Sequence, residues 1–131
     1  MTLYKPILYG FLPVDVISPV LKEDLREGRV RLSALAHKHI AQDHPEDYEF
    51  CLRYMAQAIE NPTYVGQSPW QIRNFELVKC IEDYNVLIAI GIEPNEHGSY
   101  NIRSSYRITY EKVRRRLAEK HLFWPKRGSN P

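Results

Sequence analysis

The chain has 131 residues but only two cysteines, Cys51 and Cys80. Neither belongs to a CxxC pair, and neither has cysteine or histidine neighbours at the spacing of zinc ligands. A zinc site and a disulfide framework are therefore not expected. Both thiols are expected to be buried.

Long hydrophobic runs are also missing. The longest apolar run is 86–92, whereas a membrane-spanning helix needs about 20 residues. No basic, apolar, small-residue signal pattern opens the chain. We therefore expect a cytoplasmic protein that does not enter a membrane.

The motifs of the common nucleotide-binding and hydrolase folds are absent. The sequence contains no GxGxxG, GxxxxGK or GxSxG stretch. No paired carboxylates or histidines share a face at ligand spacing, so neither a metal nor another cofactor is expected.

The net charge is only +2, but the charges are unevenly distributed. Residues 1–60 hold 7 Lys and Arg against 9 Asp and Glu, whereas residues 98–131 hold 9 against 2. A basic patch of this kind is typical of proteins that bind nucleic acid or another polyanion, although a basic terminal helix is often only a solvated face. Its most concentrated part is the run Arg114, Arg115 and Arg116.

The length suits one domain with a real core. Helices are expected from Ser18 to Gly28, from Ser33 to Pro45, from Pro45 to Asn61 and from Tyr110 to about His121. The N-cap of the third helix is expected at Asp43 or His44, and that of the last at Thr109. Strands are expected at 29–32, 63–66, 74–82, 85–93 and 99–109, and 4–12 is either a short edge strand or a segment draped over the core. We therefore predict an α+β fold, in which N-terminal helices pack on one face of a three- to four-stranded antiparallel sheet and a C-terminal helix follows. Residues 1–28 are interpreted as an N-terminal extension packed on the domain, 29–125 as the main domain, and 126–131 as a flexible tail.

Three of the five histidines fall within the segment SALAHKHIAQDHP, at 33–45. Ser33 is a preferred N-cap, and helical spacing places Leu35, Ala36 and Ile40 on one face with His39 in its middle. His37 and His44 point elsewhere. A histidine in this position is either a satisfied core residue or a functional group.

The last long strand, SYNIRSSYRIT at 99–109, carries an unusual number of polar groups. Regular alternation places Tyr100, Ile102, Ser104, Tyr106 and Ile108 on one face, and Asn101, Arg103, Ser105 and Arg107 on the other. In the preceding strand, Leu87, Ala89 and Gly91 form a face of smaller side chains that leaves room for another group to approach.

Cleavage of RNA without a metal needs a base near the 2′-hydroxyl, cationic or hydrogen-bonding groups for the phosphate, and an acid for the leaving oxygen. His39, Arg103, the two serines, Tyr106 and Lys79 are residues of the right types. The alternative is that the histidine, serine and tyrosine are interior polar groups that satisfy one another.

Several segments together resemble the phage-associated members of the barnase, EndoU, colicin and RelE superfamily of ribonuclease domains. These segments are RLSALAHKHIAQDHPEDYEF, FELVKCIE, NVLIAIGIE and YNIRSSYRIT, within about 30–120. The family pattern combines a helix histidine, a following His-Pro, and a last strand with a hydroxyl residue two positions before an aromatic. These positions correspond to His39, to His44-Pro45, and to Ser104 and Tyr106, with serine in place of the commoner threonine.

The resemblance implies attack by the 2′-hydroxyl on the adjacent phosphate, which leaves a 2′,3′-cyclic end on an RNA such as tRNA. On this hypothesis His39 acts as base or acid, Ser104 and Tyr106 position the phosphate or relay a proton, and Arg103 stabilises charge. Lys79, Ser105, Arg107, Arg114, Arg115 and Arg116 would bind the RNA. A cognate immunity protein or antitoxin would neutralise such a toxin. The alternative is a non-catalytic phage or mobile-element module that holds protein or nucleic acid.

Overall fold

The computed structural model describes residues 4–125, and within them it contains four helices and seven strands. The helices are α1 (Val14–Leu21), α2 (Ala34–Asp43), α3 (Tyr48–Glu60) and α4 (Tyr110–Ala118). The strands are β1 (Ile7–Phe11), β2 (Arg29–Leu32), β3 (Tyr64–Gly66), β4 (Asn74–Ile81), β5 (Tyr84–Gly91), β6 (Tyr100–Ile108) and β7 (Leu122–Phe123). The predicted tail at 126–131 lies outside the described residues. None of the described helices is both long and apolar enough to cross a membrane.

All seven strands join one mixed sheet in the order β1-β2-β6-β5-β4-β3-β7. The centre is antiparallel, but β2 pairs with β6 in parallel through Val30 opposite Tyr100 and Arg31 opposite Asn101. The class α+β is confirmed, whereas the predicted three- to four-stranded antiparallel sheet is wrong. Strands were expected where β1, β2 and β3 lie, but their pairing with the longer strands in one sheet was not. The two-residue β7 was not expected, because it is too short to carry an alternating pattern.

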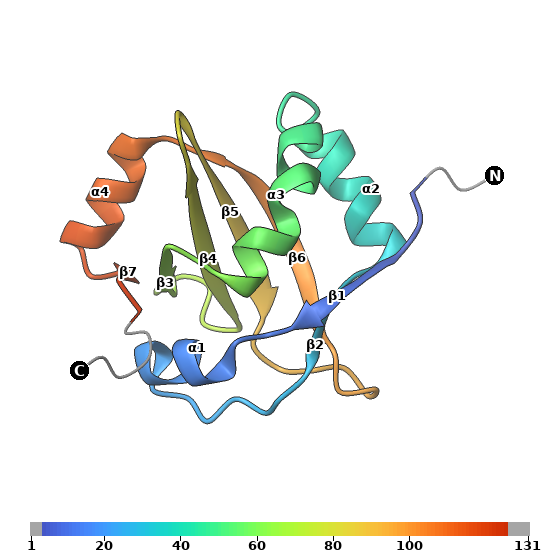
Figure 1. The fold of residues 1–131 in the computed structure, drawn as a ribbon, viewed down its shortest axis with the longest axis horizontal. Helices are drawn as coiled ribbons and strands as arrows, with labels where there is room; N and C mark the ends of the chain where they lie inside the picture. The colour runs from blue at the N-terminus through green and yellow to red at the C-terminus, as the bar shows by residue number, and fades with distance from the viewer. Residues whose placement is uncertain (1–3, 126–131) are drawn as a thin grey trace.

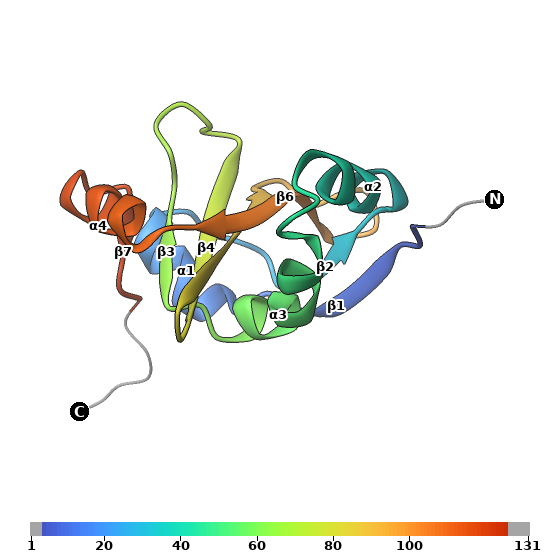
Figure 2. The ribbon, with the colours of Figure 1, turned by 90° about the horizontal axis from the view of Figure 1, so that it is seen from above.

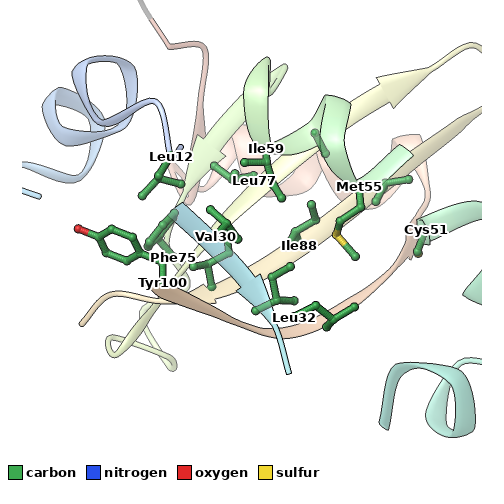
Figure 3. Close-up of a cluster of buried hydrophobic side chains, with 14 of the residues drawn as sticks. Leu12, Val30, Leu32, Cys51, Met55, Ile59, Phe75, Leu77, Ile88 and Tyr100 are labelled. Carbon is green, nitrogen blue, oxygen red and sulfur yellow. The ribbon is translucent and has the colours of Figure 1, made fainter. Parts of the chain in front are cut away.

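The main core lies between the sheet and the helices α1 and α3 (Figures 1 and 3). Val86, Ile88 and Ile90 project from β5 into it, as the alternation of that strand predicts, and they are fully buried. Met55 and Ile59 of α3 pack against them. Burial of this large β-branched face holds α3 on the sheet.

The other face of the sheet has a smaller core under α4. Val113 of α4 packs there with Val78 of β4, Leu87 of β5 and Ile108 of β6. Figure 2 shows α2 on this side of β6, with α3 on the other side. The prediction that the N-terminal helices share one face is therefore wrong for α2, and helices flank both faces.

The first 28 residues contribute directly to the sheet and the main core. β1 pairs with β2, and Leu12 and Ile17 are almost completely buried. The helix predicted to begin at Ser18 is wrong, because α1 runs over Val14–Leu21 with Pro19 inside it. Pro19 cannot donate a helix hydrogen bond, and the buried Ile17 anchors α1 to the main core.

Two predicted helix caps are confirmed. The Ser33 hydroxyl accepts from the backbone N–H of Ala36 at 3.1 Å, and that of Thr109 accepts from Lys112 at 3.2 Å. By contrast, the predicted cap of α3 at Asp43 or His44 is wrong, because α3 begins at Tyr48 after Asp47. The side chain of Asp47 is instead used to bind β6.

Candidate functional site

A cleft of about 810 Å³ opens between α2 and the beginning of β6. It joins parts of the chain that are far apart in sequence, from β1 to β6. Its lining comprises Leu8, Arg31, Ser33, Leu35, Ala36, His39, Asn95, Glu96, His97, Ser99, Asn101, Ile102 and Arg103. Much of this lining is apolar, but it also holds two cations, Arg31 and Arg103, against one carboxylate, Glu96. The two arginines make the cleft suited to an anionic ligand.

His39 reaches this cleft because α2 is rotated relative to the sequence prediction. The buried residues of α2 are His37 and Ile40, and His39 is exposed on a different side of the helix. Leu35, one turn before His39, is 64% exposed and lines the cleft beside it. The predicted grouping of His39 with Leu35 and Ala36 is therefore confirmed, but these residues line the cleft, and Ile40 is buried on another side of the helix.

The core histidine of α2 is His37. Its Nδ1 lies 2.8 Å from the carbonyl oxygen of Lys5, and its Nε2 lies 2.6 Å from the hydroxyl of Tyr48. Both ring nitrogens thus have partners, which explains how the histidine tolerates burial. His37 ties α2 to the N-terminal segment and to α3, and His39 remains free to face the cleft.

A β-bulge in β6 decides which of its side chains face the site. Ser104 lies opposite Ala89, but Ile90, the next residue of β5, lies opposite Ile102. Arg103 is therefore the extra residue, and the alternation inverts across it. Ile102 and Ser105 both face the main core, whereas Ser104, Tyr106 and Ile108 face the α4 side. The predicted uninterrupted alternation is wrong.

The bulge places Arg103 on the side of the small residues of β5. Its side chain lies over Gly91, where a Cβ atom would be 3.0 Å from the Arg103 Nε. The small-residue face of β5 is thus the surface that Arg103 approaches, and its guanidinium stays exposed. Arg103 also lines a second hollow with Ile72, Arg73, Ile92 and Glu93.

Tyr106 lies farther along β6 on the same face as Ser104. Its ring packs against that of His44, at the end of α2, with centroids 5.1 Å apart. Burial raises the pKa of the Tyr106 phenol, and the charge of Glu76 raises it further, against the opposing effect of Arg116. The phenol therefore stays protonated at neutral pH and is a hydrogen-bond donor.

Glu76 of β4 is a site residue that the sequence analysis did not single out. Its side chain is 10% exposed and forms an ion pair with Arg116 of α4. Ala89 lies between Glu76 and Ser104 in the register of the sheet, so both share a face about 10 Å apart at their backbones. The sequence signal for this residue was a single carboxylate in the otherwise apolar run Phe75 to Val78, and the structure buries all four residues of that run.

Three predicted RNA-binding residues do not reach this face. Ser105 is fully buried, and its hydroxyl donates to the Leu87 carbonyl oxygen at 2.9 Å, so its assignment to substrate binding is wrong. Lys79 donates to the carbonyl oxygen of Asn61 at 2.9 Å, at the end of α3. Arg107 also lies on the α3 side, since the bulge reverses its direction.

Arg107 has a structural partner in Asp47. Its Nε donates to Asp47 Oδ1 at 2.7 Å, and its backbone N–H donates to Oδ2 at 3.1 Å. The hydrogen bond to the carboxylate raises the pKa of the Arg107 guanidinium. Asp47 thereby provides a hydrogen-bond acceptor for a backbone N–H on the part of the β6 edge that β2 does not cover.

The three consecutive arginines of α4 have different environments. Arg114 and Arg115 are exposed, whereas Arg116 is half-buried in its ion pair with Glu76. Only the first two are therefore free to meet an external phosphate.

One group of possible metal ligands lies near the site. Single ligand atoms of His44, Glu46 and Asp47 lie within 4.8 Å of one another. The Asp47 carboxylate, however, already accepts two hydrogen bonds from Arg107. We therefore assign no chemistry to a metal here.

The chain was compared with protein-family models, with curated proteins and with solved structures, and none of them matches it.

Proposed function

We propose that this protein is a metal-independent endoribonuclease of the toxin type. The observation that carries the proposal is the meeting of His39 and Arg103, 64 positions apart in sequence, in the lining of one cleft. Ser104 and Tyr106 do not line the cleft, but they follow Arg103 along the same side of β6. A histidine, a cation and two hydroxyls are the groups that RNA cleavage without a metal requires.

In this reaction the 2′-oxygen of a ribose bonds to the neighbouring phosphorus as the bond from phosphorus to the 5′-oxygen breaks. The product ends are a 2′,3′-cyclic phosphate and a free 5′-hydroxyl. A base takes the proton of the 2′-hydroxyl, and an acid gives a proton to the departing 5′-oxygen. We assign one of these steps to His39, an exposed imidazole in the same cleft lining as Arg103. The other imidazole of the lining, His97, lies in the loop before β6 and is 3.7 Å from the carboxylate of Glu96.

The remaining groups act on the phosphate. Arg103 of β6 and Arg31 of the neighbouring strand β2 supply positive charge to the cleft, and the cation from β2 was not foreseen in the sequence. The protonated phenol of Tyr106 and the hydroxyl of Ser104 donate hydrogen bonds to the phosphate or relay a proton. Such fixed donors stabilise the charge that develops on the phosphate oxygens.

The proposal also includes the cellular compartment of the enzyme and a protein that neutralises it. The enzyme would act on RNA, such as tRNA, in the cytoplasm. A cognate immunity protein or antitoxin would hold it inactive, and an acidic partner suits the exposed Arg114 and Arg115.

The test is incubation of the purified protein with total RNA and with a tRNA pool, in excess chelator, followed by analysis of the fragment ends. We expect cyclic phosphate ends, and a loss of at least about 100-fold in rate for His39→Ala, since general acid–base groups contribute this much. The matched control is Gln42→Ala, an exposed position of α2 outside the cleft, which should keep full activity.

Equal activity of His39→Ala and the parent protein would remove His39 from the mechanism. RNA binding without cleavage by the folded protein would favour the alternative of a non-catalytic binding module. Fragments with 3′-hydroxyl ends would contradict attack by the 2′-hydroxyl.

A further inference from the structure

The loop between β3 and β4, residues 67–73, presents two large hydrophobic side chains to solvent. Trp70 is 85% exposed and Ile72 is 71% exposed. Neither belongs to a hydrophobic core cluster. Figure 2 shows this loop standing out from the sheet on the side of α2. Their exposure thus has no explanation in the packing of the described residues.

The loop is held in one shape by its own polar groups. The Gln67 side-chain amide donates to the carbonyl oxygens of Ile72 and Asn74, at 2.9 and 3.1 Å. The backbone N–H of Trp70 donates to the Ser68 hydroxyl at 3.3 Å, and the backbone N–H of Gln71 donates to the Ser68 carbonyl oxygen at 3.0 Å. A loop ordered in this way loses little conformational entropy when its side chains meet a ligand.

The loop is continuous with the cleft through Arg103. Ile72 and Arg73 line a hollow whose other members include Arg103, which itself belongs to the lining of the cleft. The carbonyl oxygen of Arg73 also accepts from the N–H of Ile92, so the loop is anchored to the chain just after β5. Arg73 and Arg103 bring two cations to a hollow with one carboxylate, that of Glu93.

Trp70 does not line this hollow, but it lies in the same short loop as Ile72 and Arg73, which do. An exposed tryptophan in a loop that also brings a cation suits a nucleobase next to a phosphate. Every base has a π-face that can stack on an aromatic ring, and the arginines suit the adjoining backbone. In a duplex the faces of the bases are already stacked, so an unpaired nucleotide is the form that a tryptophan can bind.

We propose that Trp70, supported by Ile72, is a stacking platform for an unpaired base of single-stranded or looped RNA whose phosphate lies at Arg103. The inference rests on the proposed function and deepens it, because it names the substrate class of the same site. Arg103 joins the two parts by contacting the phosphate between the stacked base and the cleft.

The experiment measures binding and not cleavage. The chain has two tryptophans, Trp70 and Trp124, so Trp124→Phe leaves Trp70 as the only indole. This variant is titrated with an unstructured 12-nucleotide 2′-O-methyl RNA, which cannot be cleaved by its own 2′-oxygen, and with the same strand in a duplex. We expect the single strand to quench Trp70 fluorescence and the duplex to leave it nearly unchanged.

A second measurement separates stacking from charge. Trp70→Ala should weaken binding of the single strand about tenfold with an unchanged salt dependence, and Trp70→Phe should restore most of the affinity. Arg103→Ala should instead lower the slope of log K against log salt by about 0.7, the value for one phosphate contact on a single strand. Trp124→Phe is the matched control and should bind like the parent protein.

Unchanged Trp70 fluorescence at saturating RNA, or an affinity of Trp70→Ala within twofold of the parent, would overturn the inference. If the protein cleaves RNA but RNA leaves the Trp70 fluorescence unchanged, the proposed function would hold and the stacking platform would be excluded. Quenching without cleavage would support the platform on a protein that binds RNA and does not cut it.

Discussion

At the scale of single residues, the bulge at Arg103 has the largest effect on the site. With regular alternation Arg103 would share a face with Ser105 and Arg107. Because Arg103 is an extra residue, Ser105 and Arg107 lie on the α3 side, and Ser104 and Tyr106 lie on the α4 side. Bulges often redirect a side chain at functional sites, and the residue types alone do not reveal one here.

Cys51 makes the stability of the fold sensitive to alkaline pH. Burial raises the pKa of its thiol from 9.0 to about 11, and the neighbouring Ser105 opposes the shift only in part. Between these values the unfolded thiol loses its proton while the folded thiol keeps it. The contribution of the Cys51 thiol to the unfolding free energy is therefore fully present below pH 9 and is lost as the pH rises from 9 to about 11.

At pH 10 the loss amounts to about 1 kcal/mol of unfolding free energy. Urea unfolding at pH 8 and pH 10 measures it. Cys51→Ala should be less stable than the parent at both pH values but should lose about 1 kcal/mol less between them. An equal pH-dependent loss in the two proteins would exclude Cys51 as the cause.

At the scale of elements, short strands complete the sheet around the predicted hairpin. β7 contains two residues, yet it pairs with β3 through Val65 opposite Phe123 and Gly66 opposite Leu122. The Gln67 N–H also donates to the His121 carbonyl oxygen at 3.0 Å. This pairing holds the chain that follows α4 against β3. It thereby helps to position α4, whose Arg116 forms the ion pair with Glu76.

The pairing of β3 and β7 depends on the absence of a side chain at position 66. A Cβ atom at Gly66 would overlap the backbone of His121 and Leu122, which cannot yield as a flexible side chain does. We expect Gly66→Ala to lower the unfolding free energy by about 2–4 kcal/mol, measured by urea denaturation. Leu122, which is buried, would lose its place.

The matched control is Gly10→Ala in β1, where a new Cβ atom would meet nothing within 4 Å. Its effect should stay within about 0.5 kcal/mol. Similar stabilities of the two variants would show that the chain after α4 contributes little to the fold.

At the scale of the whole molecule, the sheet separates two kinds of surface. The α1 and α3 side holds the main core, and there Arg107 and Lys79 bind groups of the protein itself. The α4 and α2 side carries the cleft, Ser104, Tyr106 and the exposed arginines of α4. The basic character of the C-terminal quarter is thus divided between structural ion pairs and free charge.

This division predicts how salt affects RNA binding. Loss of Arg114 and Arg115 together should reduce the slope of log K against log salt by up to about 1.4, because each phosphate contact on a single strand contributes about 0.7. Arg116→Ala should change the slope less and stability more, since it leaves Glu76 buried without its partner. Filter binding of RNA across a salt series measures the slopes.

The control for this series is Arg53→Ala, an exposed arginine of α3 on the other side of the sheet, which should leave the slope unchanged. An equal reduction for Arg53→Ala and for the double variant would mean that RNA responds to net charge and not to the α4 surface.

Local patterns in the sequence determined much of the secondary structure. Alternation in β5 predicted its buried face, and Ser33 and Thr109 were recognised as caps because their hydroxyls accept from N–H groups three residues onward. The residue types at His39, Arg103, Ser104 and Tyr106 also suggested the chemistry that is proposed. These features depend on neighbours a few residues apart, and such neighbours can be seen in a sequence.

Only the tertiary structure decided which of these groups meet. The rotation of α2 depends on the contacts of His37 with Lys5 and Tyr48. The bulge in β6, which inverts the alternation of its side chains, depends on the register of β6 with β5. The partners of Glu76, Arg107 and Lys79 come from elements that are distant in sequence. Contacts between distant residues follow from the packing of the whole chain, so no local pattern specifies them.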